Sequence, residues 1–180
     1  MDTTKIMAWI IIILMTVSVL GVVGGSFFSE DGNKKYNGFT FINTNNYWSL
    51  RVNGEEYSFQ YLPTELENLT LPAESLDFSL GKVYLGFKPA DTINWEGSLN
   101  LLAFTLYKQN IMPQESCLIE EGCPDIPIIN CQENPGIIIV SGDETSYTQD
   151  QKCLIMTATD NQELTKLTER LIYKLLGVMN

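Results

Sequence analysis

The feature that most constrains this chain is an uncharged stretch of 24 residues, from Ile6 to Ser29. An α-helix rises about 1.5 Å per residue, so about 20 apolar residues cross a hydrocarbon core roughly 30 Å thick. The stretch is long enough to span that core with a modest tilt. The sequence therefore predicts a single transmembrane anchor at residues 6–28, preceded by a short cytoplasmic tail at residues 1–5.

A cleaved secretory signal is the alternative interpretation of this stretch. Residues 1–5 form a short N-terminal region, and the small residues at 22–26 would suit a signal peptidase. However, the strongly apolar part, residues 6–23, exceeds the roughly 7 to 15 residues of a typical signal core, which favours an uncleaved anchor. Basic residues stand on both sides of the stretch, so the bias of Lys and Arg toward the cytoplasm does not decide its orientation.

The four cysteines favour disulfides and decide the orientation. They lie in the last third of the chain, without a CxxC pair, and the chain has no histidine, so the usual zinc and thioredoxin-like arrangements do not apply. Buried free thiols remain the alternative. Of the three possible pairings we favour Cys117 with Cys123 and Cys131 with Cys153. Because disulfides persist in oxidising compartments, the C-terminal domain is expected outside the cell membrane.

Charge and composition fit one acidic domain exposed to solvent. The chain has 22 acidic and 11 basic residues, a formal net charge of -11. Nucleic acid is an improbable partner because its phosphates are bound by clustered Lys and Arg, and the largest cluster here is Lys34-Lys35. Asn68-Leu69-Thr70 matches the glycosylation sequon, which makes Asn68 a candidate acceptor outside the cell.

A polar linker at residues 29–37 is expected to precede the extracellular domain at 38–180. Its first strands are predicted at 39–43, 47–52 and 55–61. The last two form a hairpin through Asn53-Gly54, because both residues tolerate the positive φ of a type I′ turn. The alternating aromatics Tyr57, Phe59 and Tyr61 form one face. Core packing is the favoured role of that face, and a sugar- or peptide-binding platform is the alternative.

The remaining elements are predicted from periodicity and capping residues. A short helix at 64–69 would begin at Thr64 with Glu67 as its capping-box partner, and strands are expected at 82–87, 136–140 and 152–157. Proline-rich residues 112–135 are expected to be irregular, and 141–150 a polar loop. One amphipathic helix would start at Asp91 or Asn94 and reach about residue 108. Another would start at Asp160, assisted by Glu163, and end at Gly177.

These elements predict an α+β domain with one mixed β-sheet, which includes an N-terminal three-stranded meander, and two main helices on one face. The two strands at 136–140 and 152–157 contain continuous apolar runs, so both faces of the sheet should be covered there. The final helix carries a leucine-rich stripe that could bind a partner helix, although packing against its own sheet is favoured.

Three segments resemble small single-span surface proteins of archaea with reduced genomes. They are CPDIPIINC at 123–131, LTERLIYKLLGVM at 167–179 and EEYSFQYLPTELENL at 55–69. The strand and helix at the C-terminal end are also similar to a unit of archaeal surface-layer proteins. The resemblance implies a role at the cell surface or envelope and carries over no functional residue.

Catalysis is not favoured by this sequence. Without histidine, no Ser-His or Cys-His relay can operate. Carboxylates could still act as acid and base, for example Asp143-Glu144, Glu120-Glu121 or Asp125, but 22 acidic residues produce such neighbours by chance. The loop at 141–145 lacks the spacing of a phosphate-binding loop or an EF-hand. The sequence therefore predicts no catalytic, cofactor-binding or metal-binding residue.

The predicted function is that of a membrane-tethered extracellular interaction or structural module rather than an enzyme. Its expected partners are the membrane, through one span, and other membrane or surface proteins. An accessory subunit of a membrane-embedded secretion or transport assembly is the first alternative. A hydrolase that depends on carboxylates is a lower one.

Overall fold

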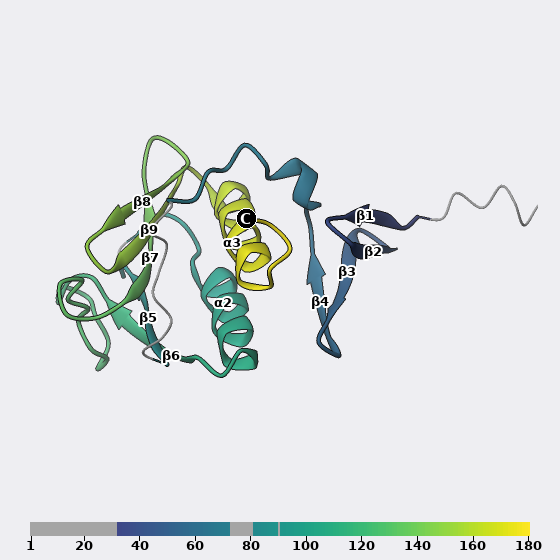
Figure 1. The fold of residues 1–180 in the computed structure, drawn as a ribbon. Helices are drawn as coiled ribbons and strands as arrows, with labels where there is room; N and C mark the ends of the chain where they lie inside the picture. The colour runs from purple at the N-terminus through teal and green to yellow at the C-terminus, as the bar shows by residue number, and fades with distance from the viewer. Residues whose placement is uncertain (1–31, 73–80, 90) are drawn as a thin grey trace, which may run out of the picture. The chain divides into compact units, whose positions relative to one another are not determined.

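The computed structural model describes residues 32–72, 81–89 and 91–180, and the residues from Lys34 to Asn180 form one compact unit. The described part of the chain contains two β-sheets and two α-helices, which confirms the predicted α+β class (Figure 1). The anchor predicted at 6–28 and the tail at 1–5 lie outside the described residues. Among the residues that are described, none of the helices is long and apolar enough to cross a membrane.

The first sheet is an antiparallel meander of four strands in the order β1-β2-β3-β4. These are β1 (Lys34–Tyr36), β2 (Phe39–Thr44), β3 (Tyr47–Val52) and β4 (Glu55–Phe59). Two-residue turns join them at Asn37-Gly38, Asn45-Asn46 and Asn53-Gly54, and all six turn residues have positive φ. The prediction of three strands and of a linker up to residue 37 is therefore corrected, because the turn at Asn37-Gly38 adds β1.

The second sheet is mixed, with five strands in the order β6-β5-β7-β9-β8. Four of them run parallel: β5 (Lys82–Phe87), β6 (Met112–Cys117), β7 (Gly136–Ser141) and β9 (Cys153–Ala158). The antiparallel strand β8 (Ser146–Asp150) lies at one edge. The prediction of one sheet was therefore wrong.

Two strands of the second sheet occupy segments that were predicted to be irregular. Strand β6 falls in the proline-rich segment and contains Pro113, which an edge strand tolerates because one side of its backbone needs no partner in the sheet. Strand β8 falls in the predicted polar loop. Its only buried residue is Tyr147, whose hydroxyl donates a hydrogen bond to the carbonyl of Leu167. Both strands lie at edges, where the apolar pattern that marks a buried strand is weakest.

The helices α2 (Glu96–Lys108) and α3 (Asn161–Leu175) lie between the two sheets (Figure 1). Their leucine-rich stripes belong to the core shared with the second sheet. On the other side, the ring of Tyr173 packs against Phe41 and Phe59 of the meander, with ring centroids 5.8 Å and 4.2 Å apart. The helices were predicted to lie on one face of a single sheet. They do cover one sheet, and the meander, a separate sheet, covers their other side.

Strand β7 is covered on both faces, as its apolar sequence predicted. Ile137 and Ile139 belong to the core beneath the helices, whereas the alternate residue Ile138 is buried on the opposite face. The connection from β6 to β7 covers that face, since a Cβ on Gly86 would lie 3.2 Å from Ile138 and 3.4 Å from Leu118. The disulfide-bearing segment therefore serves as the outer layer of the second sheet.

The capping residues were predicted with mixed success. Asp160 begins α3 as expected, and its Oδ1 accepts a hydrogen bond from the backbone N–H of Glu163 at 2.9 Å. Gly177, which follows the C-cap residue Leu176, has a φ of 72°, as expected for a glycine that ends a helix. Helix α2 follows Trp95, although the Oδ1 of Asn94 accepts from the N–H of Glu96 at 3.2 Å.

The short helix after β4 is a 3-10 helix at Pro63–Glu65 instead of an α-helix at 64–69. Proline at its first position favours an earlier start than Thr64, because its φ is fixed near the helical value. The N–H of Leu62 donates to the carboxylate of Glu65 at 2.7 Å, so Glu65 takes the role predicted for Glu67.

Both predicted disulfides are present, in the predicted pairing. Cys117, at the end of β6, is bonded to Cys123 in the following loop, and Cys131 is bonded to Cys153 at the start of β9. The second bridge ties the outer layer of the second sheet to one of its inner strands. All four cysteines are thereby paired.

We expect Gly136→Ala to lower the free energy of unfolding by about 1–3 kcal/mol, the usual cost of overpacking a core. A Cβ at this position would collide with the Cδ1 of Ile129 and lie 3.2 Å from the Sγ of Cys153. Urea unfolding measures the effect. The matched control is Gly97→Ala in α2, where a Cβ meets open space, so stability should stay equal or rise by up to about 1 kcal/mol. Equal stability of both variants would contradict the packing of Ile129 on β7.

Candidate functional site

A groove of about 350 Å³ lies where the N-terminal halves of α2 and α3 meet β4, the edge strand of the meander. Each helix contributes residues at helical spacing, so one face of each helix points to the groove. Helix α2 supplies Gly97, Ser98 and Leu101, and Asn94 lies two residues before this helix. Helix α3 supplies Asn161, Thr165, Thr168 and Glu169, and the meander supplies Tyr47, Ser58 and Gln60.

The groove is lined by hydroxyl and amide side chains more than by charged ones. Glu169 is the one carboxylate among the described lining residues, and that lining includes neither Lys nor Arg. Hydroxyls come from both helices and from β4, and amides come from Gln60, Asn94 and Asn161. Such groups donate and accept hydrogen bonds without carrying a net charge.

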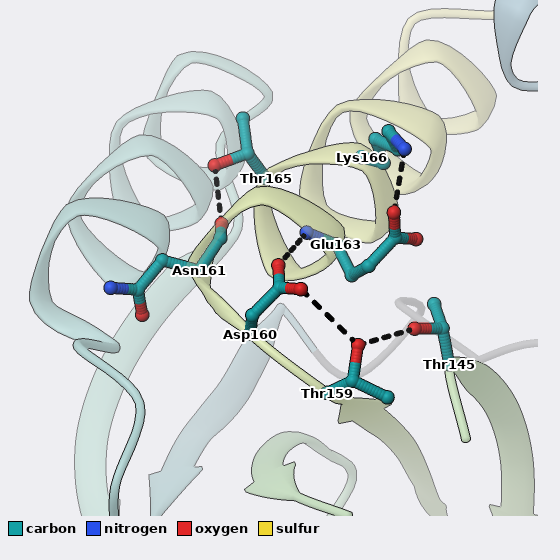
Figure 2. Close-up of polar contacts among 7 residues, drawn as sticks. All are labelled: Thr145, Thr159, Asp160, Asn161, Glu163, Thr165 and Lys166. Carbon is teal, nitrogen blue, oxygen red and sulfur yellow. Dashed lines mark hydrogen bonds and ion pairs between the residues drawn. The ribbon is translucent and has the colours of Figure 1, made fainter. Parts of the chain in front are cut away.

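The start of α3 holds two lining residues in place. Figure 2 shows Asn161 and Thr165 on one side of this helix, whereas Glu163 and Lys166 lie on its other side. The hydroxyl of Thr165 donates to the carbonyl of Asn161 at 2.9 Å, and the Oδ1 of Asn161 accepts the N–H of Asn94 at 2.8 Å. The last bond links the N-terminal ends of the two helices through two residues of the lining.

Glu169 fixes the wall between α3 and the end of β4. Its side chain is only 2% exposed, and its carboxylate accepts the backbone N–H groups of Gln60 at 2.7 Å and Tyr61 at 2.9 Å. Burial raises the pKa of this carboxyl to about 7, although the two backbone donors lower it, and the negative charge of Glu65 raises it further. One turn later, the hydroxyl of Tyr173 donates to the carbonyl of Tyr61 at 2.7 Å.

Thr168 leaves a polar atom without a protein partner beside the groove. The residue is 1% exposed, and its Oγ1 is buried without a hydrogen-bond partner among the described residues. A buried hydroxyl without a partner costs free energy, so its place in the groove lining is a reason to consider a ligand there.

Tyr47 contributes an aromatic ring to the lining from the start of β3. The residue is 50% exposed and is among the large side chains that the described surface leaves open to solvent. The groove therefore combines one accessible aromatic ring with several neutral hydrogen-bonding groups. In a binding site, polar groups of this kind fix the orientation of a ligand, and an aromatic ring supplies apolar contact area.

No protein-family model, curated protein or solved structure matches this chain. In the described ranges there is also no group of three or more His, Cys, Asp or Glu side chains placed to hold a metal ion. The interpretation of the groove depends on its own chemistry.

The carboxylates considered from the sequence do not contribute to this groove. Asp143, Glu144, Glu120, Glu121 and Asp125 are all exposed and lie elsewhere on the described surface. They belong to the loop before β8 and to the disulfide-bearing segment.

The structure also locates the glycosylation candidate and the aromatic face that were considered from the sequence. Asn68 is exposed in a turn after the 3-10 helix, and its glycosylation stays a prediction. Tyr57 and Phe59 are buried, so this part of the aromatic face of the meander packs in the core, as favoured.

Asp91, one of the two predicted starts of α2, contacts the end of β7 instead. The N–H of Ser141 donates to the carboxylate of Asp91 at 2.8 Å. Burial raises the pKa of Asp91, but this bond and others outweigh it and hold that pKa below its usual value.

The residues that line the groove were not predicted from the sequence. A signal for part of them exists, because polar residues recur at helical spacing beside the leucine stripes: Asn94 and Ser98 at the start of α2, and Asn161, Thr165 and Thr168 on α3. Such residues are ordinarily assigned to solvent. They line a groove here because a second sheet packs against the helices.

Proposed function

We propose that this protein is a membrane-tethered module that binds other molecules at the outer surface of the cell and performs no chemistry of its own. The groove between α2, α3 and β4 is the observation that carries the proposal. Its lining offers hydrogen-bonding groups for recognition, and its carboxylate, on Glu169, is already engaged by two backbone N–H groups.

The proposed location is supported by the disulfides and by the uncharged stretch of the sequence. Two bridges within one small domain are typical of proteins that fold in oxidising compartments. Residues 6–28 supply the proposed single span, with residues 1–5 on the cytoplasmic side and the domain outside.

Binding is favoured over hydrolysis by the arrangement of carboxylates. A glycosidase uses two carboxyl groups that flank the scissile bond, roughly 5 to 10 Å apart. Among the described residues that line the groove there is one carboxylate, and it holds the end of β4 in place. This geometry suits a role in structure better than a role as acid or base.

Labelling of intact cells tests the location. We expect a membrane-impermeant maleimide to label the protein only after treatment with a membrane-impermeant reductant, because the cysteines are paired and the domain that carries them is proposed to lie outside the cell. The protein should also stay with the membrane after alkaline carbonate extraction. Labelling only after permeabilisation would contradict the proposed location, and release by carbonate would contradict the tether. Labelling of intact cells without any reductant would contradict the pairing of the cysteines on which the location is argued.

Crosslinking in isolated membranes tests the binding role. We expect specific surface neighbours to be crosslinked to the wild-type protein and lost in Gly97→Trp, which fills the groove from a position where a side chain meets open space. The matched control is Asn100→Trp, an exposed position on the same helix that lies outside the groove lining. The same neighbours in both variants would contradict binding through the groove.

A further inference from the structure

We infer that the groove between α2, α3 and β4 binds a neutral saccharide, with Tyr47 as the surface against which one sugar ring packs. The inference rests on the proposed function and names the class of ligand for the same groove. Charge, hydrogen-bonding capacity, the exposed ring and size each bear on this choice.

The charge of the lining disfavours ionic ligands. Phosphate and carboxylate ligands are usually held by Arg or Lys, and the described lining contains neither. A cationic ligand would need a free carboxylate, yet both oxygens of Glu169 accept backbone N–H groups from the end of β4. A neutral ligand fits this lining best.

The hydrogen-bonding groups match a ligand rich in hydroxyls. An amide side chain offers both donors and acceptors, as does a hydroxyl, so each can pair with a sugar hydroxyl in either role. The side-chain amides of Gln60 and Asn94 belong to exposed residues of the lining, one after β4 and one before α2. The hydroxyl of Thr165, another lining residue, donates within its own helix and keeps its lone pairs as acceptors.

Tyr47 supplies the apolar part of such a site. One face of a sugar ring presents mainly C–H groups, which pack against an aromatic ring while the ring hydroxyls bind polar side chains. Tyr47 is half exposed, so its ring is available without a rearrangement of the core. The volume of about 350 Å³ lies at the lower end of the roughly 300–1,000 Å³ typical of small-molecule sites, which suits a short saccharide.

An extended peptide added to the free edge of β4 is disfavoured by the same contacts. A peptide that extends a sheet pairs with the backbone N–H groups of the edge strand. At the end of β4, the N–H groups of Gln60 and Tyr61 are already bound by Glu169. Edge pairing in the groove would have to displace that buried carboxylate.

The test uses the full-length protein in detergent micelles, titrated with three neutral trisaccharides: chitotriose, maltotriose and mannotriose. We expect at least one of them to bind with millimolar or better affinity by saturation-transfer NMR and calorimetry. Tyr47→Ala and Gly97→Trp should each weaken this binding at least tenfold, which corresponds to about 1.4 kcal/mol. Tyr107→Ala, an exposed tyrosine of α2 outside the groove lining, and Asn100→Trp should keep the affinity within about twofold.

Three outcomes would overturn the inference. One is failure of all three trisaccharides to bind; another is unchanged affinity in Gly97→Trp. The third is binding of only an acidic oligosaccharide, such as a hyaluronan tetrasaccharide, or of only an extended peptide. Urea unfolding of each variant confirms that lost binding is not lost folding. If these titrations fail while the labelling and crosslinking results hold, the ligand class is wrong and the proposed function stands.

Discussion

Removal of the Cys131–Cys153 bridge is expected to lower the free energy of unfolding more than removal of Cys117–Cys123. A disulfide restricts the unfolded chain, and the effect grows with the length of the loop that it closes. The sequence separations are 22 and 6 residues, for which the loop-entropy relation gives about 3 and about 2 kcal/mol. Urea unfolding of Cys131→Ala/Cys153→Ala and of Cys117→Ala/Cys123→Ala measures both losses.

The two double variants control for each other. Each removes one fully buried cysteine, Cys153 or Cys117, so the cavities left in the core are similar and the difference between the variants reports mainly on loop length. The longer bridge also anchors the segment that covers Ile138 on the outer face of the second sheet. We therefore expect faster amide exchange in β7 when this bridge is lost. Equal losses of stability in the two variants would contradict the dependence on loop length.

Elements whose signal is local were predicted well. Asn53-Gly54 fixes a turn through the φ of two adjacent residues, and Asp160 begins α3 through a bond to an N–H three residues later. Strand β5 was predicted with its observed bounds, Lys82–Phe87. The pairing of the cysteines was also anticipated, because the favoured bridges are the two between successive cysteines.

Features that depend on distant partners were not predicted. Strand β6 exists because it pairs with β5, from which it is separated by the whole of α2, and its own sequence includes Pro113. The presence of two sheets instead of one has the same origin. An alternating strand sequence shows which side chains are buried, but it does not show which helix or sheet covers them.

The candidate site illustrates the same limit. In sequence, Glu169 stands among polar and basic neighbours and resembles a surface residue of α3. Its burial follows from two N–H groups that lie 108 and 109 residues earlier in the chain. Every residue type except proline carries a backbone N–H group. A side chain that is bound by such groups therefore has no characteristic partner residue that could be recognised in the sequence.

Stability is expected to fall as the pH rises from about 5 to about 8, because of Glu169. Burial raises the pKa of this carboxyl to about 7 in the folded protein, from an ordinary value of 4.5. Between these values the folded state binds more protons than the unfolded state, so each increase in pH favours unfolding. At 1.36 kcal/mol per pKa unit, the loss contributed by this group is at most about 3 kcal/mol.

The variant Glu169→Gln isolates this contribution, because an amide has a similar shape and does not titrate. As the pH rises across this range, the unfolding free energy of the wild type should therefore fall relative to that of the variant. Asp91→Asn is a control of opposite sign. Burial raises the pKa of Asp91, but hydrogen bonds from Ser141, the last residue of β7, and from Thr92 outweigh it and hold that pKa below its usual value, so its contribution is lost as the pH falls below the ordinary range of an aspartate.

The expected dependence of stability on pH requires that the Glu169 carboxyl is buried between α3 and β4. Its proton is retained near neutral pH because water is excluded from this contact, and its two backbone donors only partly compensate for that exclusion. If β4 separated from α3 in solution, the carboxyl would be hydrated and its pKa would return toward the ordinary value. Equal pH slopes for wild type and Glu169→Gln would thus contradict the packing of the meander on α3, and with it the wall of the groove.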